Sequence, residues 1–399
     1  MSTARGRITR VRFAGLRTAA SVELELEGLT VLIGPNGVGK SSLIEGLELL
    51  RQVMATSDFV RVTNEDHGGP VSLLTHGASD LRLRLDVTTE DGPFSYGMVL
   101  GRITGGFGIA YESLHGSGND VVFVRTGGSV VTAGNPDKAI QLPRPREPFL
   151  PQSLIEAPMG PVGALLEGID VHGPFTTTAA WINRGSSTEQ STRSDNIVQA
   201  TSRVARGGTN LPNAFHALRN RDDWQDTLET IRLVVDADIR DVTTPASASG
   251  GSIGLAVNCR TGTGPAFALS DGTLALLSLV AITALDGGDP PRSLLVLDEP
   301  DLHLHPAAIR HVVALLERCA KRYPVVVATH SDQFLDCLAD PAQSTVLCDL
   351  DEHRHLRLQR PDATQLAKWL PEYRGVGQLR AEGYDSLVFP RPVRAANNS

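Results

Sequence analysis

The chain has 399 residues, of which 41% are apolar and 21% charged, as expected for one large globular domain or two small ones. Its formal net charge of −8 argues against a protein that coats nucleic acid without sequence preference. Because there is no run of 18 apolar residues and no apolar segment behind the N-terminal arginines, we expect neither a membrane span nor a secretory signal. Irregularly spaced cysteines predict no disulfides and no zinc site, so we expect a cytoplasmic protein.

The first third of the chain predicts strands, one amphipathic helix and then a sheet. Residues 8–13 and 22–26 alternate apolar with polar side chains, and residues 29–33 are almost continuously apolar, as in a buried strand. A glycine-rich turn follows, after which residues 40–54 repeat apolar side chains at helical spacing. From residue 81 to about residue 131, short alternating segments separated by glycine predict an antiparallel sheet.

The middle of the chain is less regular. Residues 143–161 are rich in proline and predict an irregular crossing between lobes. Residues 176–210 contain few large apolar side chains, which predicts a mobile loop or an insertion. Helical patterns return at residues 213–219 and 224–235.

The last third alternates helices with strands. We expect helices at residues 272–285 and 307–320 and strands at residues 294–297 and 325–328. Strands that alternate with helices are typical of a parallel sheet with both faces covered.

A phosphate-binding loop is predicted between the buried strand and the first helix. The run from Gly34 to Ser41 matches G-x-x-x-x-G-K-[ST] in this context. Its glycines allow backbone amides to surround a phosphate that the helix N-terminus also attracts. Lys40, one of only four lysines, is expected to reach the β- and γ-phosphates, and the Ser41 hydroxyl to ligate Mg²⁺. The residues expected to hold ATP here are Gly34, Asn36, Gly37, Gly39, Lys40, Ser41 and Ser42.

Two carboxylates follow the apolar strand at residues 294–297. Asp298 is expected to hold Mg²⁺, and Glu299 to act as the general base that polarises the attacking water. The plain alternative is a buried strand that leaves into a polar turn. The phosphate loop upstream favours the catalytic interpretation.

A helix N-terminus and a histidine complete the set. Ser270 is a good N-cap residue, and Gly272 would let a phosphate approach the helix start, although an ordinary N-cap explains both. His330 follows a buried strand, where a lone histidine is more often structural. The order of the four motifs along the chain favours the functional interpretation of both.

The motifs in this order resemble the ABC-class ATPases of the RecF, SMC and OLD group, which are often described as AAA-family proteins. The resemblance implies that Ser270 and Gly272 bind the γ-phosphate of ATP held by the partner subunit, and that His330 is the switch histidine. It also implies a nucleotide-sandwich homodimer with ATP and Mg²⁺, and a nucleotide contact for Arg17, for which a surface arginine is an equal alternative. The segments that carry the resemblance are residues 11–17, 68–69, 73–77, 208–211, 269–273, 298–300, 304–306, 329–331, 369–373 and 375–377.

The sequence departs from that group in two respects. Gln52 lies inside the first helix, so it is not the expected Q-loop glutamine, and residues 76–80 are the candidate replacement. The long coiled coil of SMC-type relatives is also absent. The expected fold is an α/β P-loop NTPase of ABC type, with a mostly parallel core sheet, an antiparallel β subdomain and a second lobe that carries the signature helix.

Domain boundaries follow from these patterns. Residues 1–135 and 286–350 are expected to form the nucleotide-binding lobe. Residues 136–285 are expected to form the second lobe, with the insertion at 176–210, and residues 351–399 a C-terminal extension.

The sequence contains three weaker constellations. His303 and His305 could ligate zinc, but the D-loop of the resembled group explains them without a metal. Asp349 and Asp351 have the D-x-D spacing of a TOPRIM nuclease, but too few residues follow for that domain. A loose basic stretch could meet DNA weakly, or be a solvated face of an arginine-rich chain. Its members are Arg203, Arg206, Arg219 and Arg221.

The function expected from these motifs is an ATP-driven dimerisation switch. It would serve DNA maintenance or phage defence together with a separately encoded effector. The alternatives are the energy-supplying subunit of a membrane transporter and a nucleotide-dependent scaffold. Glu299 argues against the scaffold, because a scaffold needs no general base.

Overall fold

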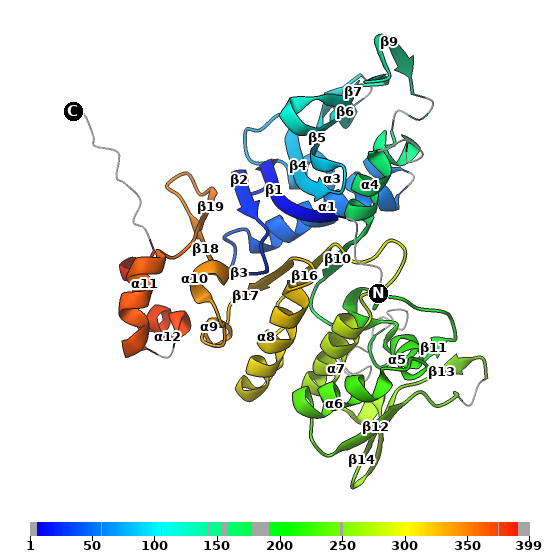
Figure 1. The fold of residues 1–399 in the computed structure, drawn as a ribbon, viewed down its shortest axis with the longest axis vertical. Coiled ribbons are helices and arrows are strands. Elements are labelled where there is room, and N and C mark those ends of the chain that lie inside the picture. The colour runs from blue at the N-terminus through cyan, green and yellow to red at the C-terminus, as the bar shows by residue number, and fades with distance from the viewer. Residues whose placement is uncertain are drawn as a thin grey trace.

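The computed structural model describes residues 6–56, 58–104, 106–142, 144, 146–153, 158–177, 191–247, 250–373 and 375–389. At its centre lies a six-stranded sheet, seen near the middle of Figure 1. Its strands follow the order β10 (Ile169–His172), β16 (Leu294–Asp298), β17 (Val325–Thr329), β3 (Leu29–Ile33), β18 (Thr345–Leu350) and β19 (Leu356–Gln359). The first five strands are parallel and β19 is antiparallel to β18. The parallel strands carry the loops at their carboxyl ends to one edge of the sheet.

A second, antiparallel sheet of eight strands covers one side of this centre. Its order is β2 (Ala19–Glu25), β1 (Gly6–Leu16), β4 (Leu81–Thr89), β5 (Gly92–Ile103), β6 (Gly106–His115), β7 (Val121–Thr126), β8 (Ser129–Thr132) and β9 (Asn135–Gln141). The antiparallel sheet expected from residue 81 onward is therefore present, and β1 and β2 extend it.

Helix α1 (Lys40–Ala55) lies between the two sheets, as Figure 1 shows. Its buried Leu47 and Leu50 share one apolar core with the antiparallel sheet and with Leu32 of β3. The same layer holds α2 (Phe59–Glu65), α3 (Gly69–Leu73) and α4 (Met159–Glu167). Burial from both sides fixes α1 and, with it, the loop that leads into it.

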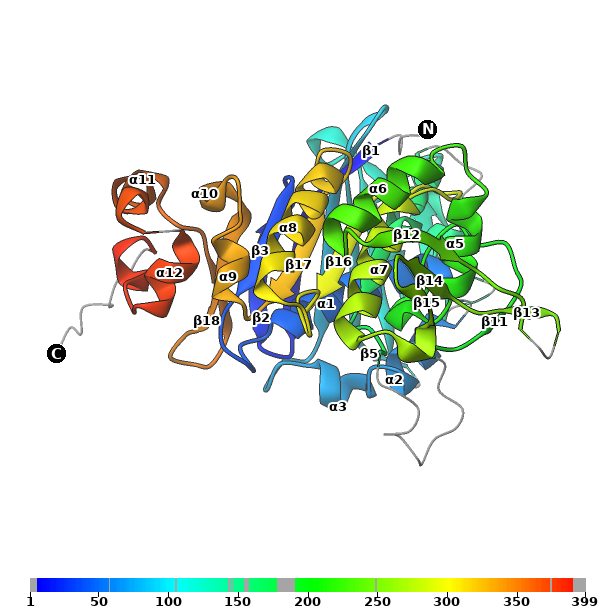
Figure 2. The ribbon, with the colours of Figure 1, turned by 90° about the horizontal axis from the view of Figure 1, so that it is seen from below.

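The other face of the central sheet is covered by helices. Val31 and Ile33 of β3 pack into a second apolar core, which explains why this strand is apolar at every position but one. The helices are α5 (Leu211–Arg219), α6 (Trp224–Val234), α7 (Asp271–Ala284) and α8 (Pro306–Ala320), seen in Figure 2. Small strands accompany them: β11 (Asn196–Ile197) with β13 (Ser252–Ile253), and β12 (Ile239–Thr243) with β14 (Ala256–Cys259) and β15 (Gly262–Pro265).

Short helices complete the C-terminal side: α9 (Asp332–Leu335), α10 (Pro341–Ser344), α11 (Ala363–Trp369) and α12 (Val376–Ala381). Helix α12 packs on α9, where Arg380 pairs with Asp332 at 2.9 Å. Single 3₁₀ turns lie at Ser117–Asn119, Leu150–Ser153, Arg206–Gly208, Ala266–Ala268, Leu370–Glu372 and Asp385–Leu387. Among the helices that the structure describes, none is long and apolar enough to cross a membrane.

Two expectations for the middle of the chain differ from the structure. Helix α4 and strand β10 join the nucleotide side of the molecule, although their residues were assigned to the second lobe. A buried ion pair explains why β10 was missed, because the polar side chain of Asp170 is paired at 2.7 Å with Arg292 inside the core. Residues 143, 145 and 154–157 of the proline-rich crossing lie outside the described residues.

The expected insertion at residues 176–210 is also different where it is described. Of residues 191–210, Thr192, Arg193, Asn196, Val204 and Gly208 are buried, whereas residues 197–200 are exposed. Hydrogen bonds to backbone oxygens explain how polar side chains can be buried here, for example from Asn196 to the carbonyl of Thr209. The expectation of a mobile loop is therefore wrong for the buried residues and stays a prediction for residues 197–200. Residues 178–190 lie outside the described residues.

Candidate functional site

The phosphate loop leads from β3 into α1. Gly39 is the N-cap residue of α1 and has a φ of 115°, a conformation that favours glycine. A Cβ there would also lie 2.1 Å from the Thr18 hydroxyl, so a larger residue would displace the loop. The helix offers its N-terminal amides at this point, which suits an anion.

Lys40 is buried within the loop, with 5% of its surface exposed. Its Nζ donates to the carbonyls of Gly34 at 2.7 Å and Pro35 at 3.1 Å, and lies 3.2 Å from Nδ1 of His330. Burial lowers the pKa of Lys40, while the carboxylates of Glu299 and Asp298 act against that shift. The ammonium therefore lies where the phosphate loop, the acidic strand end and the histidine meet.

Ser41 and Asp298 form the expected magnesium position. The Ser41 hydroxyl donates to Oδ2 of Asp298 over 3.3 Å, which joins α1 to the carboxyl end of β16. A hydroxyl oxygen beside a carboxylate oxygen is a donor set that fits Mg²⁺, which also binds the phosphates of its nucleotide. Burial raises the pKa of Asp298, and the Ser41 hydrogen bond opposes this.

Glu299 and His330 contact each other across neighbouring strand ends. His330 Nε2 lies 2.9 Å from Oε1 of Glu299, and Nδ1 lies 3.0 Å from the carbonyl of Gly34. Burial, followed by the charges of Asp301 and Asp298, raises the pKa of Glu299 to about 7. A carboxylate with a pKa near neutrality is suited to accept a proton from water.

Asp301 was not among the residues predicted for the site. Its Oδ1 accepts a hydrogen bond of 2.7 Å from the hydroxyl of Thr329, the residue before His330. This bond ties the turn after Glu299 to the end of β17. The signal in the sequence was weak, because Asp301 is one more acid in an acidic run.

The signature segment lies at the start of α7. The Ser270 hydroxyl caps the helix by accepting a hydrogen bond of 3.1 Å from the amide of Thr273. Gly272 lies so close to the D-loop that a Cβ would be 2.8 Å from the carbonyl oxygen of His303. Signature and D-loop therefore touch within one chain.

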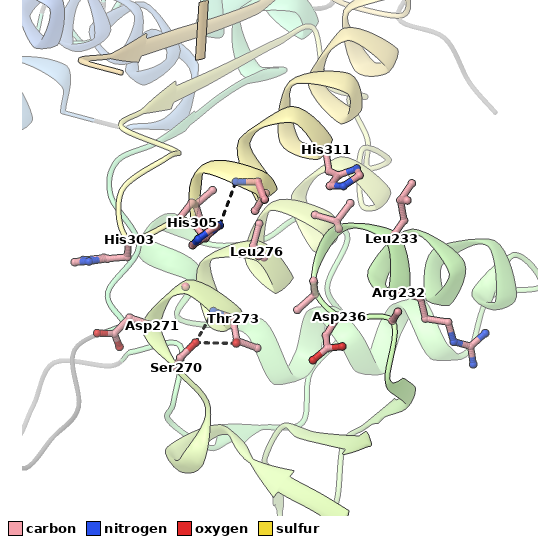
Figure 3. Close-up of a pocket in the computed structure, with 17 residues that line it drawn as sticks. Arg232, Leu233, Asp236, Ser270, Asp271, Thr273, Leu276, His303, His305 and His311 are labelled. Carbon is pink, nitrogen blue, oxygen red and sulfur yellow. Dashed lines mark hydrogen bonds between the residues drawn. The ribbon is translucent and has the colours of Figure 1, made fainter. Parts of the chain in front are cut away.

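A cavity of about 650 Å³ opens beside this contact. In Figure 3, Ser270, Asp271 and Thr273 lie below the segment that carries His303 and His305, with Asp236 at the end of α6 nearby. The described lining comes from the end of α6, the signature, the D-loop and the start of α8, and the phosphate loop contributes nothing to it. The structure thus places the predicted residues in two sets: the phosphate loop with Asp298, Glu299 and His330, and the signature with the D-loop.

Arg17 is held by α1. Its Nε pairs with Oε2 of Glu45 at 2.6 Å, and Glu45 also contacts His67 at 2.9 Å. Gln52 continues this polar face, because its amide donates to Glu48 and its carbonyl faces His67. Gln52 is therefore a helix residue and no Q-loop glutamine, while residues 76–80 and Arg17 stay predictions for the nucleotide.

Two of the weaker constellations have contacts of their own in the structure. His305 caps α8, since its Nδ1 accepts from the amide of Ala307, and within the described ranges no three His, Cys, Asp or Glu side chains gather closely enough for a metal. Each arginine of the basic stretch has a partner within its own chain, and weak DNA binding stays a prediction. Arg206 pairs with Glu48, Arg219 with Asp241 at 2.7 Å and Arg221 with Asp223 at 2.5 Å, while Arg203 donates to the carbonyl of Pro290.

Comparison with known proteins gives a family and a fold. The family model described as "AAA domain, putative AbiEii toxin, Type IV TA system" matches residues 29–105 and 186–336, more than half of the chain. No curated protein matches. Among solved structures, the SMC head domain from Pyrococcus furiosus, with an extended coiled coil and bound to the C-terminal domain of ScpA, is 13% identical with a TM-score of 0.50. The match covers 92% of this chain and 99% of that one, which shows a shared fold.

Two further SMC heads match with lower TM-scores. The head bound to the C-winged helix domain of ScpA is 15% identical with a TM-score of 0.49, over 88% of this chain and 97% of that one. The head domain from Thermotoga maritima is 13% identical with a TM-score of 0.44, over 90% and 100%.

Proposed function

Because the chain belongs to this AAA domain family, as an ATPase of the AAA and SMC-like type, we propose that it hydrolyses ATP with Mg²⁺ in a head-to-tail homodimer. In this dimer, each ATP lies between the phosphate loop of one subunit and the signature of the other. ATP binding closes the dimer and hydrolysis reopens it, which makes the protein a switch.

One observation supports hydrolysis above all: Lys40, Ser41, Asp298, Glu299 and His330 converge from three distant parts of the chain. Lys40 and the loop amides would hold the phosphates, and Ser41 and Asp298 would hold Mg²⁺, whose charge would offset that of the phosphates. Glu299 accepts a proton from the attacking water, and His330 orients Glu299 and the γ-phosphate.

The position of the signature supports the second subunit of this proposal. Ser270 and Gly272 line a cavity to which the described phosphate loop contributes no residue. A helix N-terminus that opens on a cavity can bind a phosphate brought by another molecule. A partner subunit, related by a two-fold axis, would bring its ATP to each of the two cavities.

The variant Glu299→Gln tests this proposal. The amide has the shape of the carboxylate but cannot accept the proton, so ATP should bind and turnover should be lost. We expect ATP with Mg²⁺ to trap a dimer, measured by size-exclusion chromatography with light scattering. The double variant Lys40→Ala/Glu299→Gln is the matched control and should stay monomeric. A Glu299→Gln variant that remains monomeric at saturating ATP and Mg²⁺ would contradict the sandwich.

We further propose that the switch acts in DNA maintenance or phage defence with a separate effector protein. The family description names a toxin of a toxin–antitoxin system, and SMC heads carry a bound protein domain. Both point to a protein partner. The test is a pull-down of the product of a neighbouring gene by the Glu299→Gln dimer with and without ATP. If neighbouring genes encode a membrane permease, the transporter alternative gains support instead.

A further inference from the structure

Arg193 lies underneath the signature, although it comes from a segment that the sequence predicted to be a loop. Only 5% of its side chain is exposed. Its guanidinium donates to the carbonyls of Ala266 at 2.8 Å, Phe267 at 3.3 Å and Leu269 at 2.8 Å, which form the turn before α7. Arg193 thus contacts most of the turn from which the signature begins.

Two more contacts fix the guanidinium itself. Its Nε donates to the carbonyl of Thr177 at 2.6 Å, and its Nη2 donates to Oδ1 of Asp271 at 2.5 Å. The five acceptors surround a planar group with a rigid fork of donors, which a lysine ammonium could not replace. Arg193 therefore sets the position of the turn and of the first residue of α7 together.

The pair with Asp271 also matters electrostatically. Asp271 lies in the first turn of α7, beside Ser270 and Gly272, and is 42% exposed. An unpaired carboxylate there would repel a γ-phosphate that approaches the same helix N-terminus. The positive charge of Arg193 compensates that carboxylate, so the helix amides can attract an anion.

We propose that Arg193 is a positioning residue for the signature, and that it acts on the ATP bound by the partner subunit. This inference rests on the proposed head-to-tail dimer. Arg193 holds residues 266–271 in the shape that receives the γ-phosphate and offsets the charge of Asp271. It touches no nucleotide itself.

The proposal predicts that loss of Arg193 from one subunit impairs hydrolysis of the ATP bound by the partner subunit. An Arg193→Ala subunit keeps its own phosphate loop, so its ATP affinity should stay near that of the wild type. Its signature turn loses its anchor, and a displacement of about 1 Å can lower a rate by about 10²-fold. We therefore expect turnover to fall by about that factor and ATP-induced dimerisation to weaken.

Mixing Arg193→Ala with Lys40→Ala subunits separates positioning of the signature from a purely structural role, because a structural role would not raise the turnover of the mixture. The Lys40→Ala subunit should not bind ATP, but its signature is intact. In the mixed dimer, the sound phosphate loop of the Arg193→Ala subunit meets that signature. We expect turnover of the mixture to exceed the sum of the two separate activities. No increase, while the reference pair below is rescued, would overturn the inference.

The reference pair is Ser270→Arg with Lys40→Ala, which tests the sandwich alone. If this pair is not rescued, the proposed dimer fails and the inference with it. If only this pair is rescued, the dimer stands and Arg193 acts on the fold of its own subunit. Arg260→Ala is the matched arginine control, because Arg260 is 68% exposed and pairs with Asp238 only at 3.8 Å.

Arg193→Lys keeps the test informative if the alanine variant does not fold. The ammonium keeps the charge opposite Asp271, but its three donors cannot serve that carboxylate and four carbonyls at once. We expect reduced turnover that Lys40→Ala subunits restore. Wild-type turnover of Arg193→Lys would show that the carbonyl contacts do not position the signature and would overturn the inference.

Discussion

The contact between Gly272 and the D-loop predicts that a single methyl group disables the signature. Gly272→Ala would place a Cβ 2.8 Å from the carbonyl oxygen of His303, whereas ordinary contact begins at 3.4 Å. The obstacle is backbone, which cannot rotate away as a side chain can. His303 moreover has a φ of 66°, so the D-loop is already in a conformation that non-glycine residues rarely adopt.

The size of the effect follows from these distances. The start of α7 or the D-loop must move by 3.4 − 2.8 = 0.6 Å to accept the methyl group. Such overpacking costs about 1–3 kcal/mol of unfolding free energy. Since a misplacement of about 1 Å can lower a rate by about 10²-fold, we expect turnover to fall by about 10- to 100-fold. ATP affinity of the monomer should not change, because the phosphate loop lies elsewhere.

The assays are ATP turnover, isothermal titration with ATP and thermal unfolding of the same preparation. Gly287→Ala is the matched control, because a Cβ there meets nothing within 4 Å and its φ lies outside the left-handed range. Wild-type turnover of Gly272→Ala would refute the argument, as would a loss of ATP affinity equal to the loss of turnover.

Two further predictions concern the phosphate loop and the core. Lys40→Ala should abolish ATP binding. The free energy of unfolding should change by only about 1 kcal/mol, because the lost hydrogen bonds are to carbonyls of the loop. A near-normal ATP affinity in titration calorimetry would contradict this prediction. Asp170→Asn should destabilise the fold by about 3–5 kcal/mol near pH 7. Burial alone would raise the pKa of Asp170, but His172 and Arg292 outweigh it and hold that pKa well below its usual range. The ion pair of Asp170 therefore stabilises the wild type above the pKa of this carboxyl in the unfolded chain, about 4, and this stabilisation is lost as pH falls. The difference in Tm between the wild type and Asp170→Asn should accordingly decrease towards pH 3. A gap that is constant with pH would count against the ion pair.

The grouping of the candidate residues around the phosphate loop could be predicted because each of its parts is local in sequence. Lys40 and Ser41 belong to one loop, Asp298 and Glu299 end one apolar strand, and His330 follows another. Strands β16, β17 and β3 are adjacent and parallel, so the loops at their carboxyl ends must meet at one edge. The sequence pattern and the topology of parallel sheets together determine this half of the site.

The other half depends on contacts that leave no local pattern. Arg193 reaches Asp271 across 78 residues, and it is one of 37 − 4 = 33 arginines in the chain. The sequence did not predict strand β10 for a similar reason. An aspartate such as Asp170 usually indicates a loop, and its buried partner Arg292 is evident only from the structure. Charged side chains that are buried in pairs reverse the usual relation between polarity and exposure.

The D-loop connects the two halves within one subunit. Asp298 and Glu299 stand at one end of this segment, and His303 lies against Gly272 at the other. Glu299 and His303 both have positive φ values, of 50° and 66°, although neither is glycine, and the bond from Thr329 to Asp301 fixes the turn between them. When one residue of such a strained and tightly packed backbone is displaced, the neighbouring residues shift with it, because the backbone cannot readily deform at one position. In the proposed dimer, a γ-phosphate that seats on one subunit's signature would therefore press on the segment that carries the same subunit's catalytic base. Hydrolysis at the two sites should then be coupled through residues 298–305, without any contact between the two nucleotides.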